Sequence, residues 1–364
     1  MEIIQFKRIA VVSSIFLFTS FLVTSGSAMP IRESVENIAD RLVSEQSKDI
    51  VNMGIWPNEG DFTGSIVAGM VDAYELTCDP TYKESAELGG NYILWSSFGS
   101  FFYGDEAYAL TRLSDISDDP NNNSWRDALI DFFYFVETEP GGTQVYIDSF
   151  IGSEPSAAVF YMACNVVAAY YVDANDKEIW RQGLIDWLSI IDDNTSWYPV
   201  VALGATTWAL AKTTPLNETF IDPNAQEVLF WDKMIDPNGF GVPYWKDKKL
   251  MDLPNLLLSH QVPDGEPYAG SFYWRFEYNA DDPNSYAHDL TDPNGFTEDT
   301  IFPVMGLAAA AEAARVEPNY ADLNLIDPNS YDPNICDSNS FTMWPAPVFC
   351  TSCYESISHI FSLS

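Results

Sequence analysis

Five long segments of the chain are apolar at most positions and rich in glycine and alanine. They are residues 63–77, 105–116, 154–172, 198–212 and 298–316. Small residues at close spacing let helix backbones approach one another, so these segments are predicted to be helices buried on most sides. Residues 32–48 have instead the polar and apolar spacing of an amphipathic helix. Tight acidic turns, such as Asp79-Pro80, follow several apolar segments and open more polar partner helices.

A stretch of nine residues occurs twice. Residues 124–132 read Ser-Trp-Arg-Asp-Ala-Leu-Ile-Asp-Phe, and residues 179–187 read Ile-Trp-Arg-Gln-Gly-Leu-Ile-Asp-Trp. Each copy follows an apolar helix and an Asp/Asn turn. Such repetition indicates stacked helical hairpins, because one hairpin cannot bury its apolar face alone. The predicted fold is therefore all-α: a closed ring, or α/α toroid, of five to six hairpins with buried inner and amphipathic outer helices.

The helical pattern weakens in the last third of the chain. Asp-Pro-Asn turns begin at residues 222, 236, 282 and 292, and again at 327 and 332. Residues 271–278 alternate and are aromatic, which is typical of a short strand. We therefore expect a small irregular or β insertion around residues 236–295. The predicted organisation is a signal peptide at residues 1–28, the toroid at 29–325 and an irregular C-terminal tail at 326–364.

The hairpin pattern of roughly residues 50–320 resembles the α/α-toroid superfamilies. These are the six-hairpin glycosidases, the helical polysaccharide lyases and the terpenoid-cyclase-like repeat proteins. The repeats also resemble a family of exported bacterial surface proteins of unstated activity. The sequence has no Asp-x-Asp-Asp motif of terpenoid cyclases and no clear zinc constellation of prenyltransferases. Those two activities are therefore disfavoured.

The N-terminus has the pattern of an export signal. Lys7 and Arg8 precede the apolar residues 9–23, and Gly26-Ser27-Ala28 offers small residues for cleavage. A retained membrane anchor is the alternative, although the apolar run is shorter than the ~20 residues that a span needs. The apolar residues 157–172 include Asn165 and indicate a buried helix rather than a span. We expect a secreted, periplasmic or cell-surface protein with no membrane span in its mature chain.

Charge and cysteine content limit the partners. The formal net charge is −36, which argues against nucleic acid and anionic lipid as partners. Cys164 lies in an apolar helix and is predicted to be a core residue. Cys336, Cys350 and Cys353 allow a disulfide in an oxidising compartment or free thiols. Together with His359 they form only a weak metal pattern, so neither a metal nor another cofactor is predicted.

The expected site follows from the ring geometry. If the inner helices are parallel, the segments that lead into them meet at one rim, although they are distant in sequence. The candidate catalytic carboxyl groups at this rim are Asp105, Glu106, Glu298 and Asp299. The candidate substrate-binding residues are Trp56, Tyr103, Glu154, Trp197, Tyr198 and Trp274. Aromatic faces stack on sugar rings, and paired carboxyl groups cleave glycosidic bonds. Each acid is also explained by helix capping, and the aromatic residues by filling of the mouth.

Two further residues are candidates for catalysis. Arg275 lies in Tyr-Trp-Arg-Phe-Glu, where it would anchor a carboxylate or neutralise an oxyanion. Its structural alternative is an ion pair with Glu277. His260 closes a short apolar segment and is a possible general base. A histidine that interacts with a helix dipole is the alternative.

The sequence thus leads to a secreted carbohydrate-active protein, a glycoside hydrolase or polysaccharide lyase that acts at the rim. Its partner would be a polysaccharide or oligosaccharide, and a neutral one because of the negative charge. A lyase would use His260 or a tyrosine together with Arg275. The alternatives are a non-catalytic exported protein that binds a glycan and a purely structural surface protein. The sequence has no Gly-rich phosphate loop, Gly-x-Ser-x-Gly elbow or His-Glu-x-x-His motif, so nucleotide, serine-hydrolase and zinc-protease chemistry lack support.

Overall fold

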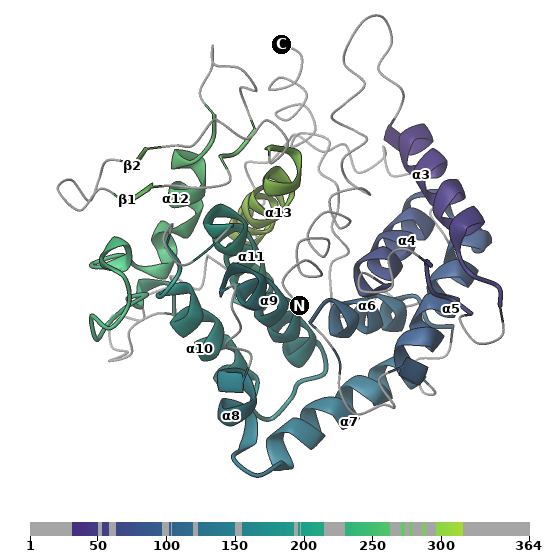
Figure 1. The fold of residues 1–364 in the computed structure, drawn as a ribbon, viewed down its shortest axis with the longest axis horizontal. Helices are drawn as coiled ribbons and strands as arrows, with labels where there is room; N and C mark the ends of the chain where they lie inside the picture. The colour runs from purple at the N-terminus through teal and green to yellow at the C-terminus, as the bar shows by residue number, and fades with distance from the viewer. Residues whose placement is uncertain are drawn as a thin grey trace, which may run out of the picture.

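The structure is a computed structural model, and it is mostly helical (Figure 1). It describes residues 31–49, 53–57, 63–96, 102, 104–118, 123–149, 155–192, 196, 198–214, 230–262, 271–273, 277–278, 286–287 and 296–315. The α-helices in this part of the chain are α3 (Ile31–Glu45), α4 (Thr63–Thr77), α5 (Pro80–Ser96), α6 (Gly104–Asp115), α7 (Ser124–Thr138), α8 (Gly142–Ser149), α9 (Pro155–Tyr171), α10 (Lys177–Leu188), α11 (Pro199–Thr213), α12 (Leu253–Ser259) and α13 (Phe296–Arg315).

The apolar pattern located the buried helices correctly. The five predicted apolar segments correspond to α4, α6, α9, α11 and α13, and every predicted end lies within two residues of the observed end. Helix α11 is the extreme case, because each residue from Pro199 to Ala211 is buried. The all-α class is therefore confirmed, and the five helices form an inner layer.

The first inner helices run parallel and begin at the same end. A Cβ atom on Gly64, in the first turn of α4, would lie 2.6 Å from the backbone of Asp105 in the first turn of α6. Near the other end of both helices, Arg112 of α6 binds Asp72 of α4 at 2.8 Å. The second contact lies further along the chain than the first in both α4 and α6. The two helices are therefore parallel.

The parallel direction continues from α6 to α9, although α9 begins six residues before the residue that contacts the start of α6. A Cβ atom on Gly104 would lie 2.0 Å from the carbonyl oxygen of Tyr161. One helix length further, the Tyr171 hydroxyl donates to Ser114 Oγ at 2.7 Å. Helices α6 and α9 are therefore also parallel.

Helices α9, α11 and α13 complete the inner layer. The backbone N–H of Tyr198, which precedes α11, donates to Ser156 Oγ in the first turn of α9 at 3.0 Å. A Cβ atom on Gly204 of α11 would lie 2.4 Å from Pro303 N in α13. Eight residues beyond Gly204, Lys212 binds Glu312 at 2.7 Å. In each of the four neighbouring pairs of inner helices, the two helices are therefore parallel or begin at the same end. The inner helices accordingly start towards one common face of the molecule.

The other long helices form an outer layer that runs in the opposite direction. In α3, Arg32 donates to the carbonyl oxygen of Thr77 at the end of α4. Helix α5 leaves α4 through a tight turn and returns along it, so that Gly89 faces Val67 near the start of α4. Figure 1 shows α7, α8 and α10 on the outside of α6, α9 and α11. The inner helices α4, α6, α9 and α11 are thus each preceded by outer helices, which are α3, α5, α7 with α8, and α10.

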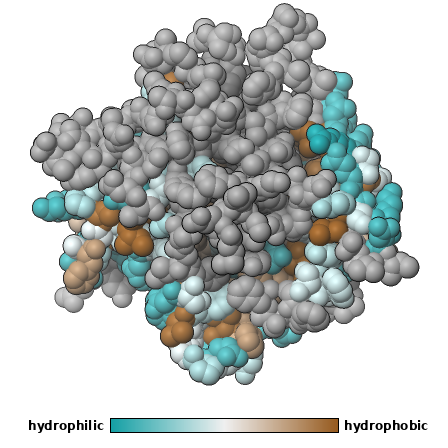
Figure 2. Space-filling model, in the orientation of Figure 1, coloured by the Kyte–Doolittle hydropathy of each residue, from teal (hydrophilic) through white to brown (hydrophobic). Residues whose placement is uncertain are grey.

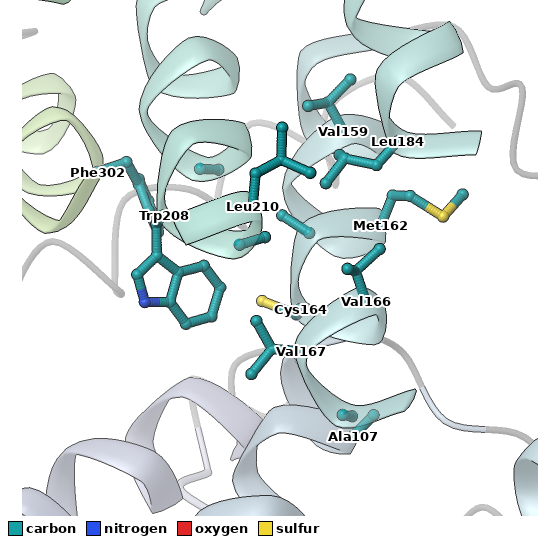
Figure 3. Close-up of a cluster of buried hydrophobic side chains, with 14 of the residues drawn as sticks. Ala107, Val159, Met162, Cys164, Val166, Val167, Leu184, Trp208, Leu210 and Phe302 are labelled. Carbon is teal, nitrogen blue, oxygen red and sulfur yellow. The ribbon is translucent and has the colours of Figure 1, made fainter. Parts of the chain in front are cut away.

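Aromatic side chains on the inner face show that the row of helices is curved. Tyr108 of α6 and Trp208 of α11 pack edge to face with ring centroids 5.1 Å apart, although α9 lies between these helices in the contact order. Phe160 of α9 and Phe302 of α13 are 4.7 Å apart across α11. Figure 3 shows apolar side chains of α6, α9, α10, α11 and α13 in one buried cluster. Apolar side chains therefore pack tightly between these helices.

The two copies of the repeated sequence occupy equivalent places in the outer helices α7 and α10. Trp125 and Trp180 are both buried at the start of their helices. The guanidinium of Arg126 lies over the Tyr171 ring at 5.9 Å, and that of Arg181 lies over the Tyr170 ring at 5.1 Å. The repeat therefore encodes how an outer helix docks on α9.

The described residues between α11 and α13 are mostly irregular, as predicted, apart from the short helix α12. Short 3-10 helices span Phe230–Asp232, Pro243–Trp245 and Leu250–Asp252. The Asp236 carboxylate accepts hydrogen bonds from the backbone N–H groups of Phe240 and Gly241, which confirms the predicted Asp-Pro-Asn turn at this position. Strands β1 (Glu277–Tyr278) and β2 (Tyr286–Ala287) form an antiparallel pair.

No helix in the described ranges is long and apolar enough to cross a membrane. Where these residues are visible in Figure 2, hydrophobic side chains form small, separate areas among hydrophilic ones, in keeping with the net charge of −36. The predicted signal peptide at 1–28 and tail at 326–364, with its three cysteines, lie outside the described residues.

Candidate functional site

The common face where the inner helices begin is called the rim here. It includes the described first turns of α4, α6, α9 and α11 and the backbone of the first turn of α13. Asp105 and Glu106 are the carboxyl residues among the described side chains of these first turns. The inner helices therefore start towards one end of the molecule, where two adjacent acids lie in the first turn of α6.

Asp105 joins the starts of α4 and α6. The hydroxyl of Ser65 in α4 donates to Asp105 Oδ2 at 3.3 Å. The backbone N–H groups of Ser65, Asp105 and Glu106 also stabilise this carboxylate. Only 5% of the Asp105 surface is exposed. Its carboxyl group is thus held between two helix N-termini, as in a cap that is shared by both helices.

Burial changes the titration of this carboxyl group. Removal from water raises the pKa of Asp105 from 3.8 to about 6, although the Ser65 hydroxyl and the backbone N–H groups act in the opposite direction. The same surroundings raise the pKa of the buried Cys164 thiol on α9, first through burial and then through the nearby Asp105 charge. The Asp105 carboxyl group therefore changes its protonation at mildly acidic pH.

The raised pKa predicts a particular dependence of stability on pH. A folded-state pKa above the unfolded value means that protonation favours the folded protein. The stabilisation by Asp105 protonation is complete below about pH 4 and is lost as pH rises through 6, which amounts to about 3 kcal/mol for a shift of about two units. Asp105→Asn removes this loss. The unfolding free energies of the variant and the wild type would be measured in urea. Between pH 4 and pH 7 their difference is expected to change in favour of the variant by up to about 3 kcal/mol.

Ser65→Ala provides the matched control for this effect. It removes a hydrogen bond that favours the charged carboxylate, so it should extend the loss of stability to higher pH. If the unfolding free energies of the wild type and Asp105→Asn changed with pH in the same way, the raised pKa of Asp105 would be contradicted.

Glu106 and Tyr198 are the other described candidates at the rim. Glu106 follows Asp105 in α6 and is half-buried. Tyr198 directly precedes α11, is half-buried, and packs against the hydrophobic core. Both side chains retain contact with solvent at the rim, so they are more accessible to a ligand than Asp105.

The structure places two of the predicted residues in the interior. Trp56 is 2% exposed, and its indole N–H donates to the carbonyl oxygen of Leu42 at 2.8 Å. In this position it supports the packing of α3 and offers no ring face to a ligand. His260 is fully buried, and its Nε2 lies 3.3 Å from the Tyr244 hydroxyl. Its described contacts are with the irregular segment rather than with the rim carboxyls.

The remaining candidates are placed only in part. Glu298 and Asp299 lie near the start of α13, whose parallel packing on α11 puts their backbone at the rim end. Tyr103, Glu154, Trp197, Trp274 and Arg275 lie outside the described residues. The structure thus brings Asp105, Glu106 and Tyr198 to one face, with the backbone of Glu298 and Asp299 at the same end.

Two features at this end were not predicted from the sequence. Ser65 belongs to a Thr-Gly-Ser start of helix α4, which is a recognisable N-terminal signal, but its pairing with Asp105 is a tertiary contact. Trp95, at the end of α5, is 61% exposed. Trp95 belongs to the last turn of an outer helix, so the ring geometry gave no reason to expect it at this end.

The chain matches no protein-family model, no curated protein and no solved structure. The resemblance to the α/α-toroid superfamilies therefore stays a prediction, and the function has to be argued from the geometry of the rim.

Proposed function

We propose that this protein is a secreted carbohydrate-active enzyme that hydrolyses a neutral glycan at the rim of an α/α toroid. The observation that carries the proposal is the parallel register of the inner helices, which gathers Asp105, Glu106 and the start of α13 on one face. In the proposal the curved row of hairpins closes into a ring, and the rim surrounds its mouth.

The chemistry assigned to the rim is acid catalysis. Hydrolysis of a glycosidic bond needs one carboxyl group to protonate the leaving oxygen and a second to act as base or nucleophile. Asp105 has the raised pKa that suits a proton donor at mildly acidic pH. Glu298 or Asp299 would provide the second carboxyl group, because the start of α13 lies at the same end. Glu106 is the more exposed alternative to Asp105 as the acid.

A hydrolase is favoured over a lyase. The lyase base predicted from the sequence, His260, lies beside Tyr244 of the irregular segment rather than in the first turn of an inner helix. Lyases also act on uronates, which a net charge of −36 would repel.

The test is turnover of a panel of neutral polysaccharides, followed by product analysis. Asp105→Asn is expected to lower kcat by about 100-fold or more, because general acid catalysis contributes about 10²–10⁴. Asp236→Asn is the matched control. Asp236 also accepts two backbone N–H groups, but it does so in the irregular segment, so the variant should retain full activity. Unchanged turnover in Asp105→Asn would remove Asp105 as the acid, and the same measurement on Glu106→Gln would then examine its neighbour.

A non-catalytic glycan-binding protein is the second candidate. The favouring observation is that the Asp105 carboxylate already accepts hydrogen bonds from Ser65 and from the starts of two helices, which is how a structural cap behaves. Binding of a neutral glycan without release of any product would support this candidate over the hydrolase.

A further inference from the structure

An exposed pair of aromatic rings lies at the end of the outer helix α5. Trp95 is 61% exposed, and Tyr92, three residues earlier on the same helix face, is half-buried. The two ring centroids are 5.9 Å apart, and the ring planes are inclined at 44°. Asn91, four residues before Trp95 and therefore on the same side of the helix, is also exposed.

The direction of α5 places this pair at the rim end of the molecule. Gly89 of α5 faces Val67, near the start of α4, and Lys83 near the start of α5 binds Asp118 beyond the end of α6. Helix α5 therefore runs antiparallel to the inner helices. Its last turn, which contains Trp95, lies at the end where α4 and α6 begin and where Asp105 and Ser65 meet.

The chemistry of the three side chains suits a sugar ring. Two inclined aromatic faces present an apolar surface to the C–H groups of a pyranose, while an amide and a phenol can hydrogen-bond its hydroxyl groups. An indole that is 61% exposed keeps a large apolar face in contact with water, and a ligand that covers it gains this hydrophobic area. The net charge of −36 disfavours anionic sugars.

We propose that Asn91, Tyr92 and Trp95 form a subsite that binds one pyranose unit of a neutral glycan at the edge of the rim. The subsite rests on the proposed function in that it takes the same class of ligand on the same face. It needs no catalysis, because it holds a sugar unit by stacking.

Affinity electrophoresis of the full chain tests the subsite. The gels contain unsubstituted β-glucan, α-glucan, mannan or xylan, with polygalacturonate as the anionic comparison. Trp95→Ala is expected to weaken binding to a neutral glycan about three- to tenfold. Trp95→Phe should retain most of the affinity, whereas Trp95→Leu should not, because leucine keeps the apolar character but lacks a ring face.

Tyr134→Ala is the matched control. Tyr134 is 63% exposed on the outer helix α7, so it reproduces the exposure of Trp95 on a different helix. The control should bind as the wild type does. An equal loss in both variants, an unchanged affinity in Trp95→Ala, or binding to none of the four neutral glycans would overturn the subsite.

The experiment separates this subsite from the catalytic proposal. Trp95-dependent binding without turnover supports the subsite and contradicts the hydrolase. Turnover that depends on Asp105 while Trp95→Ala binds normally contradicts the subsite and supports the hydrolase.

Discussion

Replacing Gly104 with alanine is expected to destabilise the protein more than any other single methyl group added to an inner helix. The new Cβ atom would lie 2.0 Å from the carbonyl oxygen of Tyr161, and this oxygen belongs to the backbone of α9. A backbone atom cannot rotate away as a side chain can, so α6 and α9 must separate. We expect a loss of about 3 kcal/mol in the free energy of unfolding, at the upper end of typical overpacking effects, measured by urea denaturation.

Gly183→Ala is the control for this prediction. Its added Cβ atom would lie 3.0 Å from Cδ1 and 3.1 Å from Cγ2 of Ile147, which are side-chain atoms that can shift slightly, and not backbone atoms. Alanine also has the higher helix propensity, so the change should stay within about 1 kcal/mol. Equal stability of Gly104→Ala and the wild type would show that α6 and α9 do not approach as closely as described.

Arg112→Met is expected to have the second large effect. Arg112 of α6 binds three carboxylates: Asp72 at 2.8 Å, Glu75 at 2.6 Å and Asp115 at 3.1 Å. Methionine keeps much of the apolar stem but leaves three negative charges together. The carboxylates retain some contact with water, so the expected loss is about 2–3 kcal/mol, below the ~3–5 kcal/mol of a fully buried pair. Thermal and urea unfolding at neutral pH would measure it.

The Arg112→Met effect should also depend on pH. Burial already raises the pKa of Glu75 and of Asp115, and in both groups Arg112 opposes this rise. Without Arg112 these two carboxyl groups of the folded protein bind protons still more tightly than in the unfolded chain, so the variant should regain stability as falling pH protonates them. Arg41→Met, which breaks the exposed pair of Arg41 with Glu45, should cost less than about 0.5 kcal/mol at any of these pH values. A deficit in Arg112→Met that is the same at pH 4 and pH 7 would contradict the electrostatic explanation.

The buried helices could be predicted closely because their signal is local. Helices such as α9 and α11 are apolar around their whole circumference, and a turn marks their limits in the sequence. The repeated nonapeptide likewise identified α7 and α10 as equivalent outer helices, and its buried tryptophans confirm this. Parallel packing was a further prediction from the hairpin pattern, and the register of Gly64, Gly104 and Gly204 against their neighbours supports it.

The site was harder to predict, since accessibility is a tertiary property. Trp56 and Tyr198 occupy similar positions before inner helices in the sequence, yet Trp56 turns inward to donate to Leu42 while Tyr198 stays half-exposed. Burial raises the pKa of Asp105, and the side-chain hydrogen bond that opposes this rise comes from Ser65, which is 40 residues away in the chain. The exposure of Trp95 reflects its position on the outer side of α5. None of these facts has a period or a spacing that a sequence pattern could reveal.

The ring contacts of Tyr108 with Trp208 and of Phe160 with Phe302 have a consequence for how such a chain can evolve. Open arrays of repeats touch only their nearest neighbours, so a unit can be gained or lost with little effect on the rest. Here each of these aromatic pairs joins helices that are two positions apart. Deleting the hairpin that contains α9 would remove the partner of Phe302 and shift Tyr108 relative to Trp208. The aromatic pairs therefore oppose the gain or loss of a hairpin among the described helices.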